Sequence, residues 1–182
     1  MVNAFAQFAR FPAAQPVRCD LNEVVEGALA VFAGRLDGID LHTELAANLP
    51  PVNIDKEQFK RVVVNLVDNA AEAMQDALVK QVRIVTRTAA TETVELTVAD
   101  TGCGVTPEDR EKLFLPYFST KGRGTGLGLA IVNHILADHS AHIRVEDNLP
   151  AGTRFIIEIP IATDAAAEEA RAAESAIPAT HV

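Results

Sequence analysis

The sequence predicts a single domain of the α+β class. Its 182 residues suit one domain with a substantial core, and 48% hydrophobic with 23% charged residues is an ordinary globular balance. Apolar residues recur at helical spacing in three long segments. Residues 81–88 and 93–100 instead alternate apolar and polar side chains, as two strands joined by a hairpin. Helices and strands are therefore expected in one fold.

The first residues carry Val2, Phe5 and Phe8 at helical spacing, so residues 1–11 are expected to end a helix. Pro12 and Pro16 break that pattern and predict a linker up to residue 16. A short strand at 17–19 should precede a helix that Asp20 caps. The apolar face of that helix consists of Leu21, Val24, Val25, Ala28, Leu29 and Phe32.

Residues 39–45 alternate and predict a half-buried strand, and residues 48–53, with two prolines, predict a turn. Asp55 with Gln58 three residues later approaches a capping box, which begins the longest helix. The inward face of this helix consists of Phe59, Val62, Val63, Leu66, Val67, Ala70 and Met74.

The second half begins with a loop, DTGCGV at 100–105, after which Thr106 and Pro107 start a short helix. A glycine run then leads into a helix that ends near Asp138. Strands at 142–146 and 153–159 complete the fold. Nine of the last 22 residues are alanine, so residues 161–182 are expected to be a frayed helix or a disordered tail.

Composition excludes several function classes. The net charge of −9 and the lack of a dense Lys/Arg run argue against a general nucleic-acid binder. Cys19 and Cys103 have no metal-ligand spacing, and no secretory leader is evident, which predicts a cytoplasmic setting. No apolar run approaches the roughly 18 residues that span a bilayer.

The glycine run GRGTGLGLAIV at 122–132 matches neither common phosphate loop. A dinucleotide fingerprint would need glycine where Leu127, Leu129 or Ile131 stands, and no P-loop string exists. What remains is a loop that becomes a helix N-terminus, which suits an anion. A mobile hinge explains the run equally well.

Two further features are ambiguous when taken singly. Asp100 ends a strand beside Gly102 and Gly104, where a carboxylate could accept a hydrogen bond from an exocyclic amine; a plain turn is the alternative. Asn65 and Asn69 share a helix face, and a carboxamide oxygen is a reasonable Mg²⁺ ligand. A pair of partly exposed asparagines is the alternative there.

In order, however, the motifs NLVDNAAEAM, DTGCG, LFLPYFSTK, GTGLGLAIV and GTRF form a specific set. The set resembles the ATP-binding domain of sensor histidine kinases, in the superfamily shared by gyrase, the MutL repair ATPases and the heat-shock chaperone ATPase. The resemblance covers roughly Asp20 to Pro160. It implies a two-layer α/β sandwich, the Bergerat fold, in which a mixed, mainly antiparallel sheet packs under three helices and a mobile lid covers ATP.

The resemblance also implies roles for individual residues. Asp100 matches the aspartate that accepts the adenine amino hydrogen, with Gly102 and Gly104 leaving room for the ring. Thr153 matches a threonine that helps to hold a water there. Asn69 matches the Mg²⁺ ligand, and Asn65 its neighbour on the helix. The phosphate box consists of Gly124, Thr125, Gly126, Leu127 and Gly128, with Lys121 assigned to the triphosphate.

Position 65 distinguishes the histidine kinases from the ATP hydrolases of this superfamily, although relatives that phosphorylate serine keep the hydrolases' glutamate there. Its ATP hydrolases carry a glutamate four residues before the metal-binding asparagine, and Asn65 cannot replace it as a general base. We therefore expect Asn65, Asn69 and Lys121 to serve transfer of the γ-phosphate to a histidine. The alternatives are a nucleotide-binding regulatory module without transfer activity and an ATP hydrolase.

Some positions depart from the family pattern. The segment YFSTK lacks the arginine common there and is closer to nitrogen-regulation kinases of the NtrB/NtrY type. Ser140-Ala141 replaces a glycine pair, which should cost about 1 kcal/mol of stability at a left-handed helix end. The five histidines lie in no phosphoacceptor context, so each is expected to be structural or solvated.

The resemblance finally predicts domains and partners. Residues 1–16 should be the end of a dimerisation helix and a linker, and residues 17–160 the catalytic domain. The expected partners are a histidine-bearing dimerisation domain and a response regulator, with no nucleic acid. The parent kinase is expected to be a homodimer, with this domain cytoplasmic and the full-length protein anchored in the inner membrane.

Overall fold

The computed structural model describes residues 12–89, 92–119 and 125–163. Its centre is a five-stranded sheet with strand order β2-β4-β5-β7-β6. The strands are β2 (Asp40–Leu45), β4 (Gln81–Thr88), β5 (Thr93–Asp100), β6 (His142–Asp147) and β7 (Thr153–Pro160). Only β2 and β4 pair in parallel, while the other neighbours are antiparallel. The expected mixed, mainly antiparallel sheet is confirmed.

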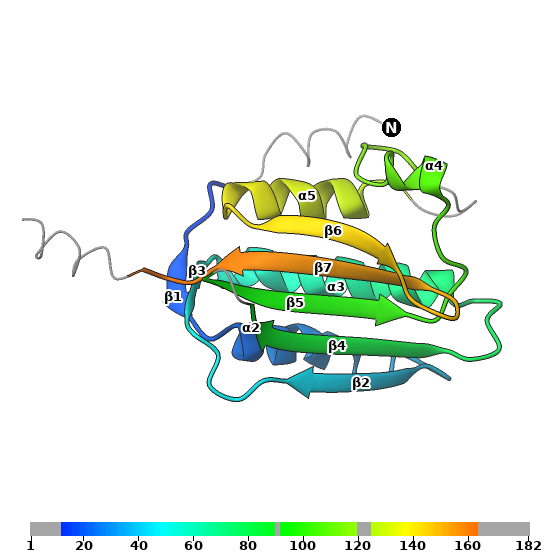
Figure 1. Ribbon diagram of the computed structural model, residues 1–182, viewed down its shortest axis with the longest axis horizontal. Helices are drawn as coiled ribbons and strands as arrows, with labels where there is room; N and C mark the ends of the chain where they lie inside the picture. The colour runs from blue at the N-terminus through cyan, green and yellow to red at the C-terminus, as the bar shows by residue number, and fades with distance from the viewer. Residues whose placement is uncertain (1–11, 90–91, 120–124, 164–182) are drawn as a thin grey trace, which may run out of the picture.

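Three helices cover one face of this sheet (Figure 1). They are α2 (Leu21–Leu29), α3 (Lys56–Ala73) and α5 (Gly128–Asp138), and the turn η1 (Ala30–Phe32) extends α2. Asp20 caps α2 by accepting from the N–H of Asn22, and Asp55 caps α3 by accepting from Glu57 and Gln58. The short α4 (Pro107–Arg110) begins after Thr106, whose hydroxyl accepts from the N–H of Asp109. All four helix starts agree with the sequence.

The core lies between the sheet and these helices. Alternate residues of β4, β5 and β7 face it, and α3 crosses the middle with an entirely buried apolar stripe. The largest fully buried side chains of the core include Leu21, Ile54, Phe59, Leu66, Met74, Ile84, Leu96, Ile135, Leu136, Ile157 and Ile159. None of the helices in the described ranges is long and apolar enough to cross a membrane.

The predicted turn at 48–53 is partly wrong, because residues Val52–Ile54 form strand β3. This strand pairs antiparallel with β1 (Val17–Cys19) in a separate two-stranded sheet. Val52 also bridges Ile161, and the N–H of Ala162 donates to the carbonyl of Pro51. Pro50 and Pro51 indicated a turn, whereas β3 forms through pairing with β1, more than thirty residues earlier in the chain. As a result, β1 at the start of the fold and Ile161 at its end lie on either side of β3.

The end of α5 is held by a buried histidine. Nδ1 of His139 lies 2.7 Å from the carbonyl oxygen of Ile135, and its Nε2 accepts from the N–H of Asp55 at 2.9 Å. Its ring packs edge-on against Phe59 at 5.0 Å between centroids. The expected structural role therefore fits His139. Ser140 follows with φ of 53°, the left-handed conformation expected at this helix end.

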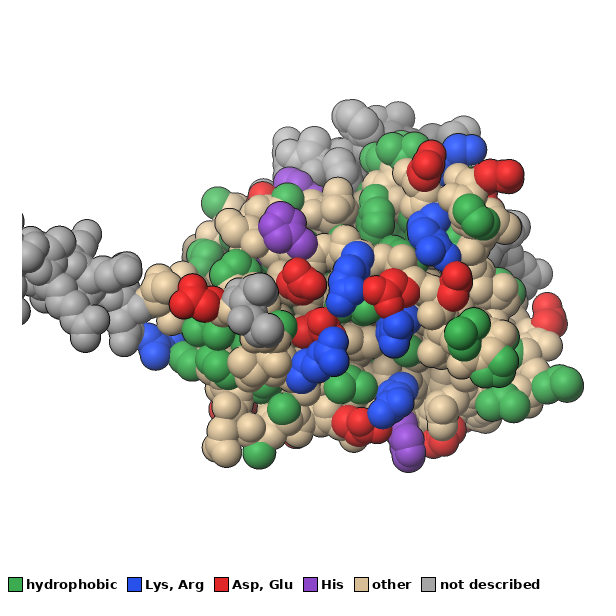
Figure 2. Space-filling model, in the orientation of Figure 1, with side chains coloured by type: hydrophobic (Ala, Val, Ile, Leu, Met, Phe, Trp, Pro, Cys, Tyr) green, Lys and Arg blue, Asp and Glu red, His purple; other side chains and the backbone are tan. Residues whose placement is uncertain are grey.

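The other face of the sheet carries alternating acidic and basic side chains (Figure 2). Arg83 binds Glu44 on neighbouring strands. Glu95, with only 5% of its side chain exposed, binds both Arg87 and Arg144. Burial raises the pKa of Glu95, but hydrogen bonds and charges from the two arginines outweigh burial and lower it. This face is therefore polar and internally neutralised.

Candidate functional site

A cavity of about 410 Å³ lies between α3, the start of α5 and the adjoining ends of β5 and β7. It is lined by nine of the residues that the sequence singled out: Asn65, Asn69, Asp100, Gly104, Thr125, Gly126, Leu127, Gly128 and Thr153. Gly102 is not among the lining residues and packs against Ala73 instead. Lys121 and Gly124 lie outside the described residues. The fold thus brings together motifs that are up to 88 positions apart, from residue 65 to residue 153.

The carboxylate of Asp100 is buried and held in one orientation. Asp100 is 3% exposed at the end of β5. Its Oδ1 accepts hydrogen bonds from the N–H of Gly102 at 2.8 Å and from the N–H of Thr153 at 3.2 Å. Two main-chain donors on one oxygen orient the carboxylate more firmly than a side-chain partner would, because neither donor can rotate away.

The turn between β6 and β7 supports Asp100 from its main-chain side. Nδ2 of Asn148 donates to the carbonyl oxygen of Asp100 at 2.7 Å, and the N–H of Asn148 donates to Gly152. Gly152 has φ of 117°, and a Cβ on it would lie 1.9 Å from that same Asp100 oxygen. Only glycine permits this approach.

The loop after Asp100 packs against the last turn of α3. A Cβ on Gly102 would lie 2.7 Å from both the Cβ and the carbonyl oxygen of Ala73. The N–H of Cys103 donates to that carbonyl at 3.1 Å. Gly102 therefore allows close packing of the loop, whereas Gly104, with φ of 74°, lines the cavity itself.

The two asparagines of α3 face the first residue of α5. A Cβ on Gly128 would lie 2.9 Å from Oδ1 of Asn65 and 3.9 Å from Nδ2 of Asn69. Nδ2 of Asn65 donates to the carbonyl of Arg61 one turn earlier, at 2.8 Å. This bond turns the oxygen of the Asn65 carboxamide toward α5. Glycine at position 128 lets the two helices meet at this point.

The N-terminus of α5 opens into the cavity. Leu127 occupies the N-cap position, and in the described residues no side chain caps this end. The first N–H groups of a helix have no partner inside the helix, and they carry the positive end of its dipole. An anion in the cavity would therefore find main-chain donors there.

The segment that ends at Phe118 contacts Gly126, just before α5 begins. The N–H of Tyr117 donates to the carbonyl oxygen of Gly126 at 2.9 Å. Tyr117 has φ of 65°, and a Cβ on Gly126 would lie 2.6 Å from its carbonyl carbon. Tyr117 and Gly126 are thus held together just before the start of α5.

The described lining of the cavity carries negative charge. Its described lining contains the carboxylates of Asp68, Glu72 and Asp100 and no Lys or Arg. Burial raises the pKa of Asp68, Arg35 opposes that shift and Glu72 adds to it. Apolar side chains complete the wall, from Val105, Leu113, Phe118, Leu129, Ile131 and Phe155. Among the described lining residues, an anionic ligand finds no basic side chain.

Sequence reasoning missed Asn148 and Asp68. Asn148 lies in the turn DNLPAG, whose composition predicts a turn but not the residue on which the turn packs. Asp68 lies within the motif NLVDNAAEAM, and the asparagines beside it gave the stronger signal. The helical period places Asp68 three residues after Asn65, so its proximity to the cavity could have been found.

The sequence of the chain is similar to those of known proteins. A family described as histidine kinase-, DNA gyrase B- and HSP90-like ATPase matches residues 54–163. The signal transduction histidine-protein kinase AtoS of Escherichia coli (strain K12) is 32% identical over 163 residues, 88% of this chain and 26% of AtoS. The chain therefore spans about a quarter of the length of that relative.

Solved structures agree with this similarity. The catalytic domain of the histidine kinase ThkA matches with a TM-score of 0.72 and 32% identity, over 81% of this chain and 96% of that domain. ThkA in complex with the response regulator protein TrrA matches with a TM-score of 0.74 and 26% identity, over 88% of this chain and 46% of that one.

Proposed function

The chain belongs to the family of histidine kinase-, DNA gyrase B- and HSP90-like ATPases, as an ATP-binding domain of the histidine kinase type, and from this premise we propose how it acts. It binds Mg-ATP in the cavity between α3 and α5 and donates the γ-phosphate to a histidine on a dimerisation domain. Residues 17–160 form this catalytic unit. Residues 1–16 would join it to the dimerisation helix, and residues 161–182 would be a tail that leaves the fold after the contacts of Ile161 and Ala162.

The oriented carboxylate of Asp100 carries the proposal. Its bonds to the N–H groups of Gly102 and Thr153 leave a fixed acceptor at the end of the cavity. The exocyclic amine of adenine is a donor of the right kind, and guanine offers a carbonyl at that position instead. Adenine would then lie along Gly104, with Thr153 beside the same carboxylate.

The phosphates would lie toward the N-terminus of α5, near Gly126 and Gly128. The described lining offers three carboxylates and no cation, so a metal would help to balance the charge of the triphosphate. The carboxamides of Asn65 and Asn69 supply oxygen donors at this point, which suits Mg²⁺, and Asn69 would be its ligand. Mg²⁺ supplies neutralisation of the phosphate charge. Lys121, Gly124 and Thr125 would complete the triphosphate site.

Transfer is favoured over hydrolysis because of Asn65. A carboxamide does not accept a proton near neutral pH, so Asn65 cannot activate a water molecule. Phosphoryl transfer depends mainly on positioning and charge neutralisation, which the cavity offers to an incoming nucleophile. A response regulator would act downstream, as TrrA associates with ThkA. The parent would be a homodimer anchored in the inner membrane, with this domain cytoplasmic.

Calorimetry with Mg-ADP tests the nucleotide site. Asp100→Asn places an amide where the adenine amine should donate, and a hydrogen bond to a charged group is worth about 1.5–3 kcal/mol. We expect affinity to fall at least about tenfold. Asp37→Asn, at an exposed carboxylate outside the cavity, should bind as wild type does. Equal affinity of wild type and Asp100→Asn would refute the placement of adenine.

Transfer needs a separate measurement. The chain should label a histidine-bearing dimerisation domain, supplied in trans, from radiolabelled ATP. It should release almost no free phosphate alone. Binding without transfer to any such domain would favour a regulatory module instead, and steady phosphate release would favour a hydrolase.

A further inference from the structure

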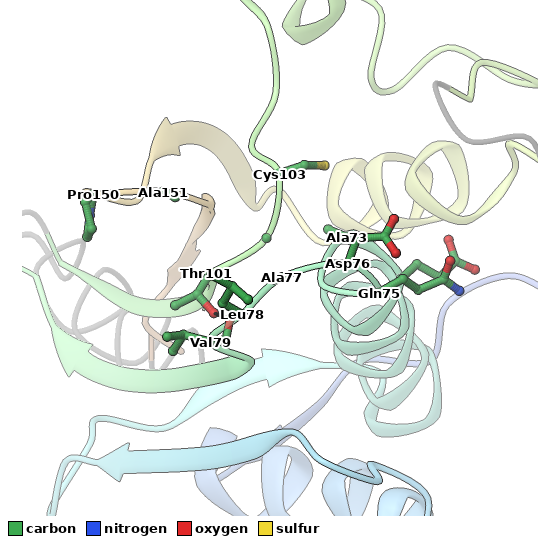
Figure 3. A pocket seen from close by; sticks show the side chains of 12 residues that line it. Ala73, Gln75, Asp76, Ala77, Leu78, Val79, Thr101, Cys103, Pro150 and Ala151 are labelled. Atoms are coloured by element: carbon green, nitrogen blue, oxygen red, sulfur yellow. Dashed lines mark hydrogen bonds between the residues drawn. The ribbon is translucent and has the colours of Figure 1, made fainter.

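A second cavity of about 780 Å³ lies beside the nucleotide cavity and is larger than it. Three segments surround it, as Figure 3 shows: the end of α3 with the chain that follows, the loop after β5, and the turn between β6 and β7. Leu78, Val79 and Thr101 lie between Cys103 on one side and Pro150 with Ala151 on the other. All of its lining residues are described.

The floor of this cavity is hydrogen-bonded in place. The hydroxyl of Thr101 donates to the carbonyl of Val79 at 2.7 Å and accepts from the N–H of Gln81 at 3.0 Å. On the other side, the N–H of Cys103 donates to Ala73. These bonds fix the backbone on both sides of the cavity, and preformed walls are typical of small-molecule sites. The two cavities share only Glu72, Ala73 and Cys103.

The lining is mainly apolar and contains side chains that no packing in the described fold explains. Leu78 is fully exposed at 104%, and Val79 is 67% exposed. Leu149, next to the lining residue Pro150, is 86% exposed. Ala73, Ala77 and Ala151 extend the apolar surface. Apolar side chains gathered around a concave surface are typical of a binding site.

The charged side chains that line this cavity are acidic. Glu72 and Asp76 lie in the lining, which contains no Lys or Arg. Helix α3 also ends at this cavity, and its C-terminus carries the negative end of the helix dipole. The nearby ammonium of Lys80 is bound to the carbonyl oxygen of Gln75 at 2.7 Å and lies outside the lining. The two carboxylates outnumber this one positive charge, so the local potential favours a cation.

From this combination we propose that the second cavity binds a small organic cation, with an apolar body and one ammonium or guanidinium group. The apolar body would lie on Leu78, Val79 and Ala151, and the positive group would face Asp76 at the end of α3. The volume is within the range of about 300–1,000 Å³ found for small-molecule sites. The site is separate from nucleotide binding and does not depend on it.

Three probes with one ring system test both location and charge: 2-naphthylmethylamine, 2-naphthalenemethanol and 2-naphthylacetate. Backbone amide shifts of ¹⁵N-labelled protein are followed by NMR, with and without saturating Mg-ADP. The amine should bind saturably with a Kd of about 1 mM, as expected for a ligand of about a dozen non-hydrogen atoms. Shifts should centre on Leu78, Thr101 and Ala151 and persist with Mg-ADP present. The acetate should bind at least about fivefold more weakly than the amine.

Two variants sharpen the result. Ala151→Trp should fill the cavity and remove saturable binding of the amine. Asp76→Asn should weaken the amine by about threefold, the size of an exposed charge pair, and leave the alcohol unchanged. Glu26→Gln, at an exposed carboxylate on α2, is the matched control and should change neither.

Other outcomes would overturn the proposal. Equal affinity for the three probes would reject a cation site. Shifts centred on Asn69 and Leu127 would assign binding to the nucleotide cavity. Absence of saturable binding would reject a site altogether. A failure of Mg-ADP to bind would refute the nucleotide proposal alone, because the amine is also tested without nucleotide.

Discussion

Gly152 and Asp100 lie so close together that a Cβ on the glycine would be 1.9 Å from the carbonyl oxygen of the aspartate. The same turn donates the N–H of Thr153 to the Asp100 carboxylate, so fold and candidate site depend on one contact.

We therefore expect Gly152→Ala to lower the free energy of unfolding by about 2–4 kcal/mol and to weaken Mg-ADP binding. Gly34→Ala is the control, because Gly34 has φ of 72° but nothing within 4 Å of its would-be Cβ. It should lose only about 1 kcal/mol. The free energy of unfolding of both variants is measured in urea. An equal loss for Gly152→Ala and Gly34→Ala would show that glycine is needed at 152 for its positive φ and not for the close approach to Asp100.

Asn148 should act on nucleotide affinity through Asp100. Asn148→Ala removes the donor to the Asp100 carbonyl, so the aspartate loses one of its supports. We expect Mg-ADP affinity to fall about three- to tenfold, with about 1 kcal/mol lost from stability. Asn148→Asp, which cannot donate, should show at least the same loss. A stability loss with unchanged affinity in calorimetry would contradict this role.

Gly128 and Asn65 should be energetically coupled. In the Asn65→Ala background, Gly128→Ala should stabilise α5 by up to about 1 kcal/mol, since alanine is the better helix former. In wild type that gain should be lost, because the new Cβ would lie 2.9 Å from Oδ1 of Asn65. The double-mutant cycle is measured by thermal unfolding. Strict additivity would show that the two residues do not restrict each other.

Glu95 should make stability depend on acid. Its folded pKa is lowered by Arg87 and Arg144, so its contribution is complete above its unfolded pKa of about 4.3 and is lost as pH falls through the lower folded value. Glu95→Gln should lose about 1 kcal/mol at pH 7, since both arginines are partly exposed. That difference should shrink below about pH 4 in urea unfolding. Glu44→Gln, at an exposed pair, should show a smaller effect.

Ser140→Gly should stabilise the protein. Ser140 has φ of 53°, which glycine adopts without strain, so we expect a gain of about 0.5–1 kcal/mol. Ser140→Ala keeps the Cβ and should bring no gain. Thermal unfolding of the two variants separates backbone strain from loss of the hydroxyl.

The sequence predicted local structure well because the signals were local. Asp55 and Thr106 cap the helices that their positions indicated. The hairpin between β4 and β5 needs only neighbouring residues, and Thr88 does pair with Val94. Asp100 and the asparagine pair could be assembled into one site only through the resemblance, because their meeting depends on the whole fold.

The features that could not be predicted from the sequence are contacts between residues far apart along the chain. The partner of β3 is β1, and the two prolines before β3 gave a local signal for a turn. The hydrogen bond from the N–H of Asp55 to His139 joins residues 84 positions apart. The second cavity arises from three loops whose compositions are ordinary. The resemblance to nitrogen-regulation kinases in particular stays a prediction.

The bridge between Val52 and Ile161 has a practical consequence for protein engineering. Because β1 and Ile161, the residue after β7, both pair with β3, the entry and exit of the fold lie side by side, at the opposite end of β5 from Asp100. The unit could replace a surface loop of a host protein with little stretching of the host chain. Such a chimera would leave both cavities open to solvent and could serve as a ligand-dependent reporter.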